Sequence, residues 1–136
     1  MTRVVTVVLC IVCLTLTACA TRTGVSEELD RSVKAYNRML RWRELENAVL
    51  TYTDPEQREK YQKQAETLIK RGISVTDFRI LSTQYLPENQ SGAVVAEFDY
   101  FILPSNRVKT ISHRQDWVYR ESSKSWKLKN GLPPFE

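Results

Sequence analysis

Cysteine is nearly absent from this sequence of 136 residues, and its three cysteines, Cys10, Cys13 and Cys19, all lie within the first 19 positions. The rest of the chain therefore contains no disulfide framework and no thiol nucleophile. Histidine is rarer still, since His113 is the only one. A chain of this composition cannot build a soft or imidazole-rich metal site, so we expect neither a metal ion nor another cofactor.

Glycine is also scarce, and the four glycines stand alone at positions 24, 72, 92 and 131. A loop that cradles phosphate groups at a nucleotide site needs clustered glycines, so the chain has no such nucleotide-binding motif. The Gly-x-Ser-x-Gly signature of serine hydrolases is missing as well. These absences exclude the common nucleotide-binding and serine-nucleophile classes of enzyme.

The charge balance is mildly basic, with 20 lysines and arginines against 16 acidic residues. A basic chain can bind nucleic acid, but here the cations form no stripe with interleaved aromatic residues. We interpret Arg38, Arg41 and Arg43 as part of a solvated helix face. The sequence therefore predicts no nucleic-acid partner.

Long hydrophobic runs are missing too, apart from a short stretch at the start of the chain. Residues 4–16 are apolar, interrupted only by threonines, and follow Arg3. As a helix this stretch would span roughly 20 Å, which is short for a hydrocarbon core of about 30 Å. A positive residue followed by a short apolar region is typical of a secretory signal. The alternative interpretation is an uncleaved amino-terminal membrane anchor.

The apolar stretch ends in Leu16-Thr17-Ala18-Cys19, which resembles the lipobox of bacterial lipoprotein precursors. The resemblance implies cleavage before Cys19, a diacylglyceryl group on its sulfur and an acyl group on the new amino terminus. Two or more fatty chains give stable attachment to a membrane. Ala20 stands where an aspartate is associated with inner-membrane retention, so the resemblance implies the outer membrane and its periplasmic face. We expect a signal peptide (1–18), a lipidated tether (19–25) and one domain (26–136).

The first half of this domain has helical periodicity. Ser26, followed by acidic residues, predicts the start of a helix whose buried stripe is Leu29, Val33, Tyr36 and Leu40. The stripe loses its phase after Leu40, which predicts a bend or a short second helix over 42–50. Asp54-Pro55 predicts the next helix start, with Asp54 as N-cap, and Gly72 its end. That helix is expected to bury Tyr61, Ala65, Leu68 and Ile69.

From residue 73 onward the apolar pattern has a period of two. It predicts strands over 73–86, 93–103, 108–121 and 126–129, a bulge near Thr76-Asp77, and an irregular closing segment over 130–135. Helices followed by hairpins predict an α+β domain. We expect two or three N-terminal helices packed on one face of a curved, four-stranded antiparallel sheet in a cone-like arrangement.

A hairpin loop over 104–107 fixes a register in which Leu103 faces Val108. The pairs then continue with Tyr100–Ile111, Phe98–His113, Ala96–Gln115 and Val94–Trp117. Because side chains alternate between the two faces of a sheet, all of these share one face, and Leu128 joins it beside Tyr119. The other face is expected to hold a cross-strand ion pair between Glu97 and Arg114.

A second resemblance rests on Tyr36-Asn37-Arg38, Trp42, Trp117-Val118-Tyr119 and Trp126-Lys127-Leu128. Over about 25–135 the chain resembles small exported members of the nuclear transport factor two-like superfamily. The resemblance implies helices and a bent sheet that enclose a pocket, although no extra helix is found between the first two strands. The three tryptophans are interpreted as core residues, with an aromatic binding wall as the alternative.

The expected pocket face carries the candidate ligand-binding residues Tyr100, His113, Gln115, Trp117 and Tyr119. Some relatives with this fold are isomerases or dehydratases in which an inward carboxylate or histidine is the general base. Here the carboxylates of Glu97, Asp99 and Asp116 fall on the opposite face, so a dyad with His113 needs a different strand pairing or Asp77 of the first strand. The alternative is a core histidine hydrogen-bonded to a tyrosine or a backbone carbonyl.

The leading hypothesis is therefore a non-enzymatic binding or assembly module for an envelope protein partner or a small apolar ligand. The alternative is an isomerase-like or dehydratase-like enzyme with His113 as general base. A third hypothesis is assembly, including a homodimer, through the outer sheet face around Val95, Phe101 and Val118.

Overall fold

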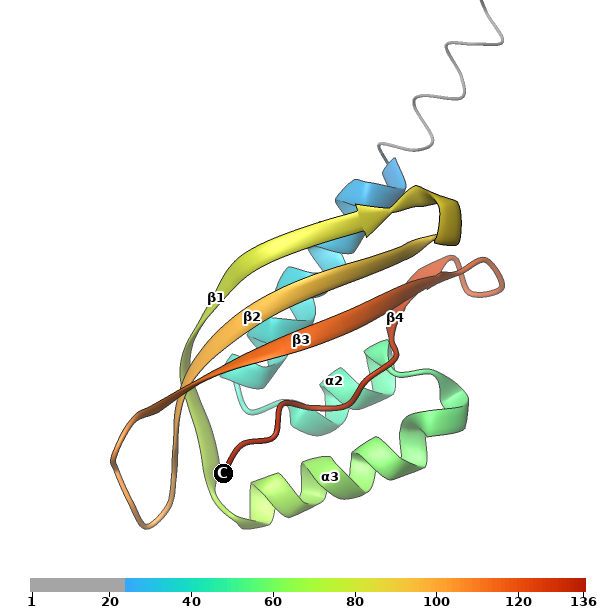
Figure 1. Cartoon of the computed structure of the whole chain (residues 1–136). Coiled ribbons are helices and arrows are strands. Elements are labelled where there is room, and N and C mark those ends of the chain that lie inside the picture. Colours follow the sequence, from blue (N-terminus) through green and yellow to red (C-terminus); the bar gives the residue numbers. More distant parts are fainter. Residues whose placement is uncertain (1–23) are drawn as a thin grey trace, which may run out of the picture.

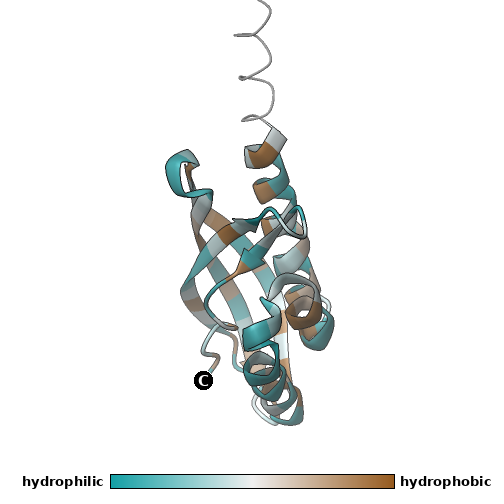
Figure 2. Cartoon of the chain, turned by 90° about the vertical axis from the view of Figure 1, so that its right-hand side faces the viewer, coloured by the Kyte–Doolittle hydropathy of each residue, from teal (hydrophilic) through white to brown (hydrophobic). Residues whose placement is uncertain are grey.

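The computed structural model describes residues 24–136, which form a layer of helices on one face of a four-stranded antiparallel sheet (Figures 1 and 2). The first helix occupies 24–41 and is followed by α2 (Leu45–Tyr52), the 3₁₀ turn η1 (Pro55–Gln57) and α3 (Arg58–Lys70). The sheet order is β1 (Ile73–Leu86), β2 (Ser91–Ile102), β3 (Lys109–Arg120) and β4 (Ser125–Leu128), with η2 (Pro87–Asn89) between β1 and β2. The predicted α+β class is confirmed. The signal peptide, the lipobox and Cys19 lie outside the described residues.

The first helix buries the predicted stripe of Leu29, Val33, Tyr36 and Leu40. It already includes Gly24 and Val25, so the prediction that Ser26 is its N-cap is wrong. The Val25 carbonyl accepts a hydrogen bond from Trp126 Nε1 of β4 at 3.1 Å, which ties the start of this helix to the sheet.

The predicted bend after the first helix is confirmed. Arg43 takes a left-handed conformation with φ 64°, and the Glu44 N–H donates to the Met39 carbonyl, which closes the helix. α2 begins two residues later and turns Leu45, Ala48 and Val49 into the core.

Asp54 precedes the next helical segment, as predicted, but its side chain does not cap it. The carboxylate pairs instead with Arg120 at the end of β3, with Arg120 Nε donating to Oδ1 at 3.1 Å. The last residue of α3 is Lys70, and Gly72 follows as the predicted stop in a left-handed conformation with φ 74°, where an added Cβ would lie 2.9 Å from Leu103 Cβ. The prediction that Ile69 is buried is wrong, because it faces solvent near the end of α3.

The predicted strand pairing is wrong by two residues, whereas the face predicted for the paired residues within β2 and β3 is right. Leu103 and Val108, predicted on the same face, lie outside the strands and are exposed. Tyr100 pairs with Lys109, Phe98 with Ile111 and Val94 with Gln115, and in the next hairpin Tyr119 pairs with Trp126. A slip of two residues keeps every side chain on its face, so the apolar pattern cannot distinguish the two registers and only the turns decide. In the second hairpin the turn shifts to 121–124, with Lys124 in a left-handed conformation (φ 45°).

The predicted pair of Glu97 and Arg114 does not form because of this slip. Glu97 binds Arg79 of β1 at 2.7 Å, and Asp99 binds the same guanidinium at 3.1 Å. Arg114 pairs with Asp116 on its own strand. The expected bulge in β1 is present between Val75 and Asp77.

The core lies between the sheet and the helices, and Figure 2 shows the two layers edge on. The first helix passes close to β2, since an added Cβ on Gly92 would meet Leu29 Cδ2 at 2.5 Å. The largest fully buried side chains include Trp117, Trp126 and Phe135. The aromatic residues of the strands and of the closing segment therefore fill the concave side of the sheet.

Candidate functional site

The five predicted ligand-binding residues lie on the sheet face that turns toward the helices, but each contacts a different neighbour. Gln115 binds the first helix, while Trp117 packs on Tyr36 and Tyr52. Tyr119 packs on Trp126 of β4, and Tyr100 and His113 contact the C-terminal segment. The protein's own elements thus occupy this face.

Gln115 and Asn37 form a reciprocal pair of buried amides. Gln115 Nε2 donates to Asn37 Oδ1 at 2.7 Å, and Asn37 Nδ2 donates back to Gln115 Oε1 at 3.3 Å and to the Val33 carbonyl at 2.8 Å. Buried polar groups need such partners, so the pair fixes the first helix against β3. The sequence analysis missed the role of Asn37. A polar residue one turn after Val33, inside an apolar stripe, is the signal that could have found it.

Three aromatic rings meet beside this amide pair. Tyr36, Tyr52 and Trp117 contact one another edge to face, with centroid distances of 5.6 to 5.9 Å. Burial raises the pKa of the Tyr36 phenol well above its ordinary value, so it stays neutral. Tyr36 Oη and Trp117 Nε1 are buried without a hydrogen-bond partner among residues 24–136. The triad is a packing element in which apolar contact dominates.

His113 is half-buried, and its Nε2 lies 3.3 Å from the Gly131 carbonyl oxygen. That contact requires the proton on Nε2, because a carbonyl can only accept. Burial lowers the pKa of His113 below its ordinary value, against opposing effects of the Gly131 carbonyl and of Asp116. Among residues 24–136 no carboxylate hydrogen-bonds to this ring. The imidazole is therefore neutral at neutral pH and is oriented by the closing segment.

This environment makes stability depend on pH in a defined window. Unfolding restores the ordinary pKa of 6.5, so the unfolded chain binds a proton more readily than the folded one. We expect the midpoint of urea-induced unfolding to fall as the pH drops from about 7.5 to about 5.5. Asp54 and Asp99 have pKa values lowered by hydrogen bonds to Arg120 and Thr110, so they titrate below this window. The control is His113→Gln, which should flatten the profile; an unchanged slope in that variant would contradict the assignment.

The C-terminal segment completes the core in a way that the sequence analysis did not foresee. Phe135 packs on Phe98 and Tyr100, with centroid distances of 5.8 and 4.8 Å, and Leu132 is buried beside it. Tyr100 Oη donates to the Glu136 carbonyl oxygen at 2.9 Å. The segment has no regular secondary structure, as predicted, and yet it covers the end of the sheet.

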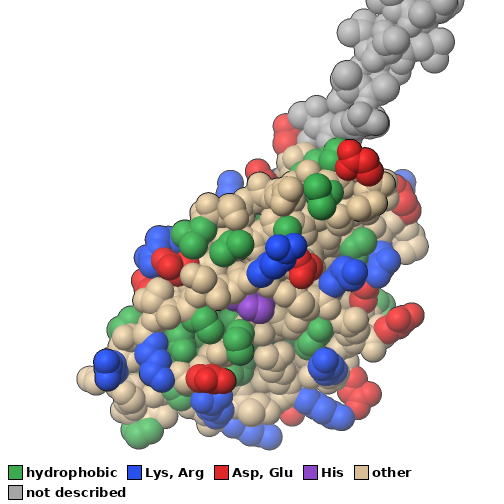
Figure 3. All heavy atoms as spheres, in the orientation of Figure 1, with side chains coloured by type: hydrophobic (Ala, Val, Ile, Leu, Met, Phe, Trp, Pro, Cys, Tyr) green, Lys and Arg blue, Asp and Glu red, His purple; other side chains and the backbone are tan. Residues whose placement is uncertain are grey.

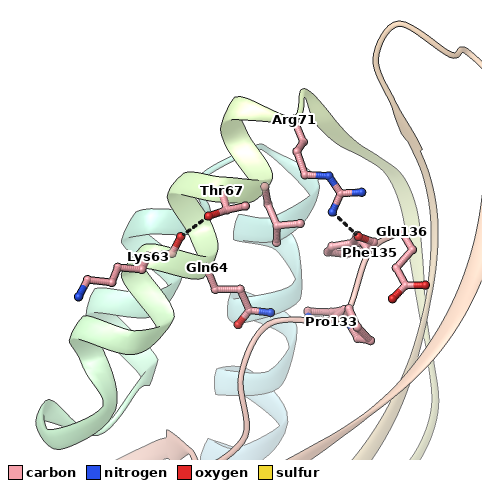
Figure 4. A pocket seen from close by; sticks show the side chains of 9 residues that line it. Lys63, Gln64, Thr67, Arg71, Pro133, Phe135 and Glu136 are labelled. Carbon is pink, nitrogen blue, oxygen red and sulfur yellow. Dashed lines mark hydrogen bonds between the residues drawn. The ribbon is translucent and has the colours of Figure 1, made fainter.

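A groove of about 400 Å³ runs between α3 and this segment (Figure 4). Gln64 and Arg71 point across it, and they donate to the carbonyls of Leu132 and Phe135 at 3.2 and 3.1 Å. Lys63 points away from the segment. Since the chain's own carbonyls use these donors, the groove is a hydrogen-bonded seam within the domain.

Exposed apolar side chains gather at the end of the domain opposite residue 24. We call this surface the distal face and define it by Trp42, Ile69, Leu103 and Val108, which are 66, 40, 56 and 55% exposed. The end of α3, the start of β1 and the β2–β3 loop meet there (Figure 1), and the Leu103 N–H donates to the Gly72 carbonyl. Arg41 lies over the Trp42 ring at 5.4 Å and donates to the Val75 carbonyl, which ties the end of the first helix to β1. The prediction that Trp42 is a core residue is wrong, whereas Trp117 and Trp126 are buried as predicted.

Four exposed cations are neighbours of distal-face residues along the chain. Lys70 and Arg71 follow Ile69, and Arg107 and Lys109 flank Val108. On the side of the molecule in Figure 3, carboxylates lie near the upper end, and lysines and arginines are spread over the lower half together with some carboxylates.

The outer sheet face is mostly polar. Arg79, Glu97, Asp99 and Thr110 form a hydrogen-bonded network across β1, β2 and β3. Val95, Phe101 and Val118, the residues of the assembly hypothesis, are half-buried on this sheet. Among residues 24–136 no group of three metal-ligating side chains comes together, and no helix in that range is long and apolar enough to cross a membrane.

The arrangement defines a small α+β domain of helices on an antiparallel sheet, with a filled concave face and an apolar distal face. No protein-family model matches the sequence, and no curated protein matches it. The crystal structure of the intermembrane space region of the chloroplast protein ARC6 is similar to this fold, with a TM-score of 0.53 and 13% sequence identity. The match covers 78% of this chain and 93% of that chain. At this identity the similarity shows the fold alone.

Proposed function

We propose that this protein is a lipid-anchored binding module on the periplasmic face of the bacterial outer membrane, and that its distal face docks an envelope protein. The anchor is inferred from the lipobox that ends at Cys19 and from Ala20, which follow a secretory signal. The described domain begins at the opposite end from the distal face. In this arrangement the tether holds one end near the membrane and presents the other end to the periplasm.

The exposed apolar cluster on the distal face is the observation that carries the docking proposal. Single exposed apolar residues are normal on soluble domains, but several large ones toward the same end of a domain are typical of an interaction surface. Tryptophan is enriched among residues that dominate binding energy, and Trp42 is the most exposed large apolar side chain in the described domain. Trp42 is therefore the proposed anchor of the interface.

The neighbouring cations indicate the chemistry of the partner. A complementary surface would place an apolar patch against Trp42 and Leu103 and carboxylates against Lys70 and Arg107. The packed concave face favours a protein partner over a small apolar ligand, because Trp117, Phe135 and the Asn37–Gln115 pair already occupy it. Within residues 24–136 no carboxylate hydrogen-bonds to His113, so the enzyme alternative has no such contact to support it.

Site-specific photocrosslinking in intact cells tests the docking surface. We expect a photoreactive residue at Leu103 or Val108 to give one discrete protein adduct. The same residue at Gln84 of β1 or Ser123 of the β3–β4 turn, both exposed and away from the distal face, should give none. The adduct should decrease with rising ionic strength, because exposed charges at the rim are screened by salt.

The matched variants separate docking from folding. Trp42→Ala should abolish the adduct at Leu103 and leave the midpoint of unfolding nearly unchanged. Arg107→Gln should weaken the adduct and leave the unfolding transition unchanged. Equal adducts at all four positions, or a full adduct in Trp42→Ala, would contradict docking at the distal face.

A further inference from the structure

A second surface feature lies between the α2–α3 connection and the β3–β4 hairpin. It is a cavity of about 700 Å³, separate from the distal face and from the concave face. Its lining comes from three parts of the chain: the segment Asp54–Arg58, the end of β3 with the following turn, and β4. The side chains at its wall that can donate hydrogen bonds are Arg58, Arg120, Ser122, Ser123 and Lys127.

The carboxylates that line this cavity do not pair with all of its cationic side chains. Asp54 is paired with Arg120, which binds both of its oxygens. Glu56, the other acidic residue of the lining, is exposed to solvent and forms no ion pair within residues 24–136. Arg58 and Lys127 therefore remain as cations that no carboxylate in the described chain neutralises by direct contact.

Arg58 is the most unusual of these groups. Its Nε is buried and has no hydrogen-bond partner among residues 24–136. A buried N–H without an acceptor is destabilising, and more so in a charged group. The Nε itself is closed to solvent, so a ligand in the cavity would reach Arg58 through the terminal N–H groups of the guanidinium, which form no ion pair within residues 24–136.

Lys127 adds a second cation close to Arg58. Its Nζ donates to the Thr51 carbonyl at 2.7 Å, which places the ammonium group at the cavity and leaves two of its three protons for another acceptor. Burial, followed by repulsion from Arg58, lowers the pKa of Lys127, whereas Asp54 opposes this effect. An anion between the two cations would relieve this repulsion.

From these contacts we propose that the cavity is a binding site for a phosphate group, held by Arg58 and Lys127 with the hydroxyls of Ser122 and Ser123. The donors come from α3, β4 and the β3–β4 turn, and such a number of N–H and O–H groups suits an anion with several oxygens. The volume exceeds that of a free phosphate ion, so the ligand class is a phosphate ester.

The position of the cavity leaves two sources for that phosphate. Trp126 Nε1 donates to the Val25 carbonyl, so the start of β4 lies against the first turn of the described chain. If the proposed anchor is correct, a lipid head group lies within reach of the β3–β4 turn; a soluble phosphate ester needs no anchor. The phosphate site itself does not depend on the proposed function.

The Arg58 Nε–H resonance in proton–nitrogen NMR spectra of the purified full-length protein is the direct probe. We expect a saturable shift of this signal on titration with inorganic phosphate or glycerol phosphate, and none with chloride at the same ionic strength. Arg58→Lys identifies the signal by its loss. Lys127→Gln should weaken phosphate binding about tenfold, the loss expected for one charge-assisted hydrogen bond.

Lys124→Gln is the matched control, because Lys124 is an exposed cation of the β3–β4 turn that does not line the cavity. It should bind phosphate as the parent protein does. In lipid nanodiscs without added phosphate, a shifted Arg58 signal with phosphatidylglycerol but not with phosphatidylcholine assigns the site to a lipid head group. If glycerol phosphate shifts the Arg58 signal and neither kind of nanodisc does, the site binds a soluble phosphate ester. No saturable shift, or equal weakening by Lys127→Gln and Lys124→Gln, overturns the phosphate site and leaves the proposed docking function unaffected.

Discussion

Replacing Cys19 by alanine is expected to abolish fatty-acid labelling of the protein and to move it from the outer-membrane fraction to the soluble periplasmic fraction. The physical reason is the anchor that we propose. Each buried methylene of an acyl chain contributes about 0.8 kcal/mol, so two or three chains on Cys19 would suffice for stable attachment. Labelling with palmitate and separation of the membranes by density measure both effects.

Two kinds of variant act as controls for this result. Cys10→Ala and Cys13→Ala remove the other thiols of the chain and should leave labelling intact, because neither follows a lipobox. Ala20→Asp should keep the label and shift the protein to the inner membrane, as the lipoprotein resemblance implies. Mass spectrometry that finds an unmodified chain starting at Met1 would refute the anchor and the compartment together.

Trp117→Ala is expected to destabilise the domain by about 3–5 kcal/mol, a large share of the 5–15 kcal/mol typical of a domain of this size. Trp117 is fully buried and packs edge to face on Tyr36 and Tyr52. Its Nε1 makes no hydrogen bond within residues 24–136, so the loss comes from the cavity and from the missing aromatic contacts. Urea unfolding followed by circular dichroism measures the change.

Trp42→Ala is the matched control, because it removes the same side chain from an exposed position. We expect it to change the free energy of unfolding by about 0.5 kcal/mol or less, as most surface substitutions do. If the free energy of unfolding fell by a similar amount in both variants, Trp42 as well as Trp117 would contribute to the core. The same pair distinguishes folding from docking, since only Trp42 belongs to the distal face.

The sequence by itself determined the order of the helices and strands and the face on which the residues of β2 and β3 lie. The apolar periodicity and the stop signals are local properties of the sequence. Gly72 stops α3, and the stripe of Leu29, Val33 and Tyr36 faces the core. The alternation along β2 and β3 puts Phe98 and Trp117 on one side. These local patterns could not distinguish two strand registers that differ by two residues, because a slip of two residues keeps every side chain on its face. The turn conformation at Lys124 resolved that ambiguity in the second hairpin.

Only the tertiary structure decided which side chains meet. Asp54 binds Arg120 rather than its own helix, Asn37 finds Gln115 across the core, and Phe135 covers the end of the sheet. These contacts join residues that lie dozens of positions apart, so no local pattern encodes them. For the same reason the five candidate residues could be placed on one face from the sequence, whereas their neighbours could not. The cavity at Arg58 and Lys127 and the distal face arise where separate elements end side by side, which is a property of packing and not of any one segment.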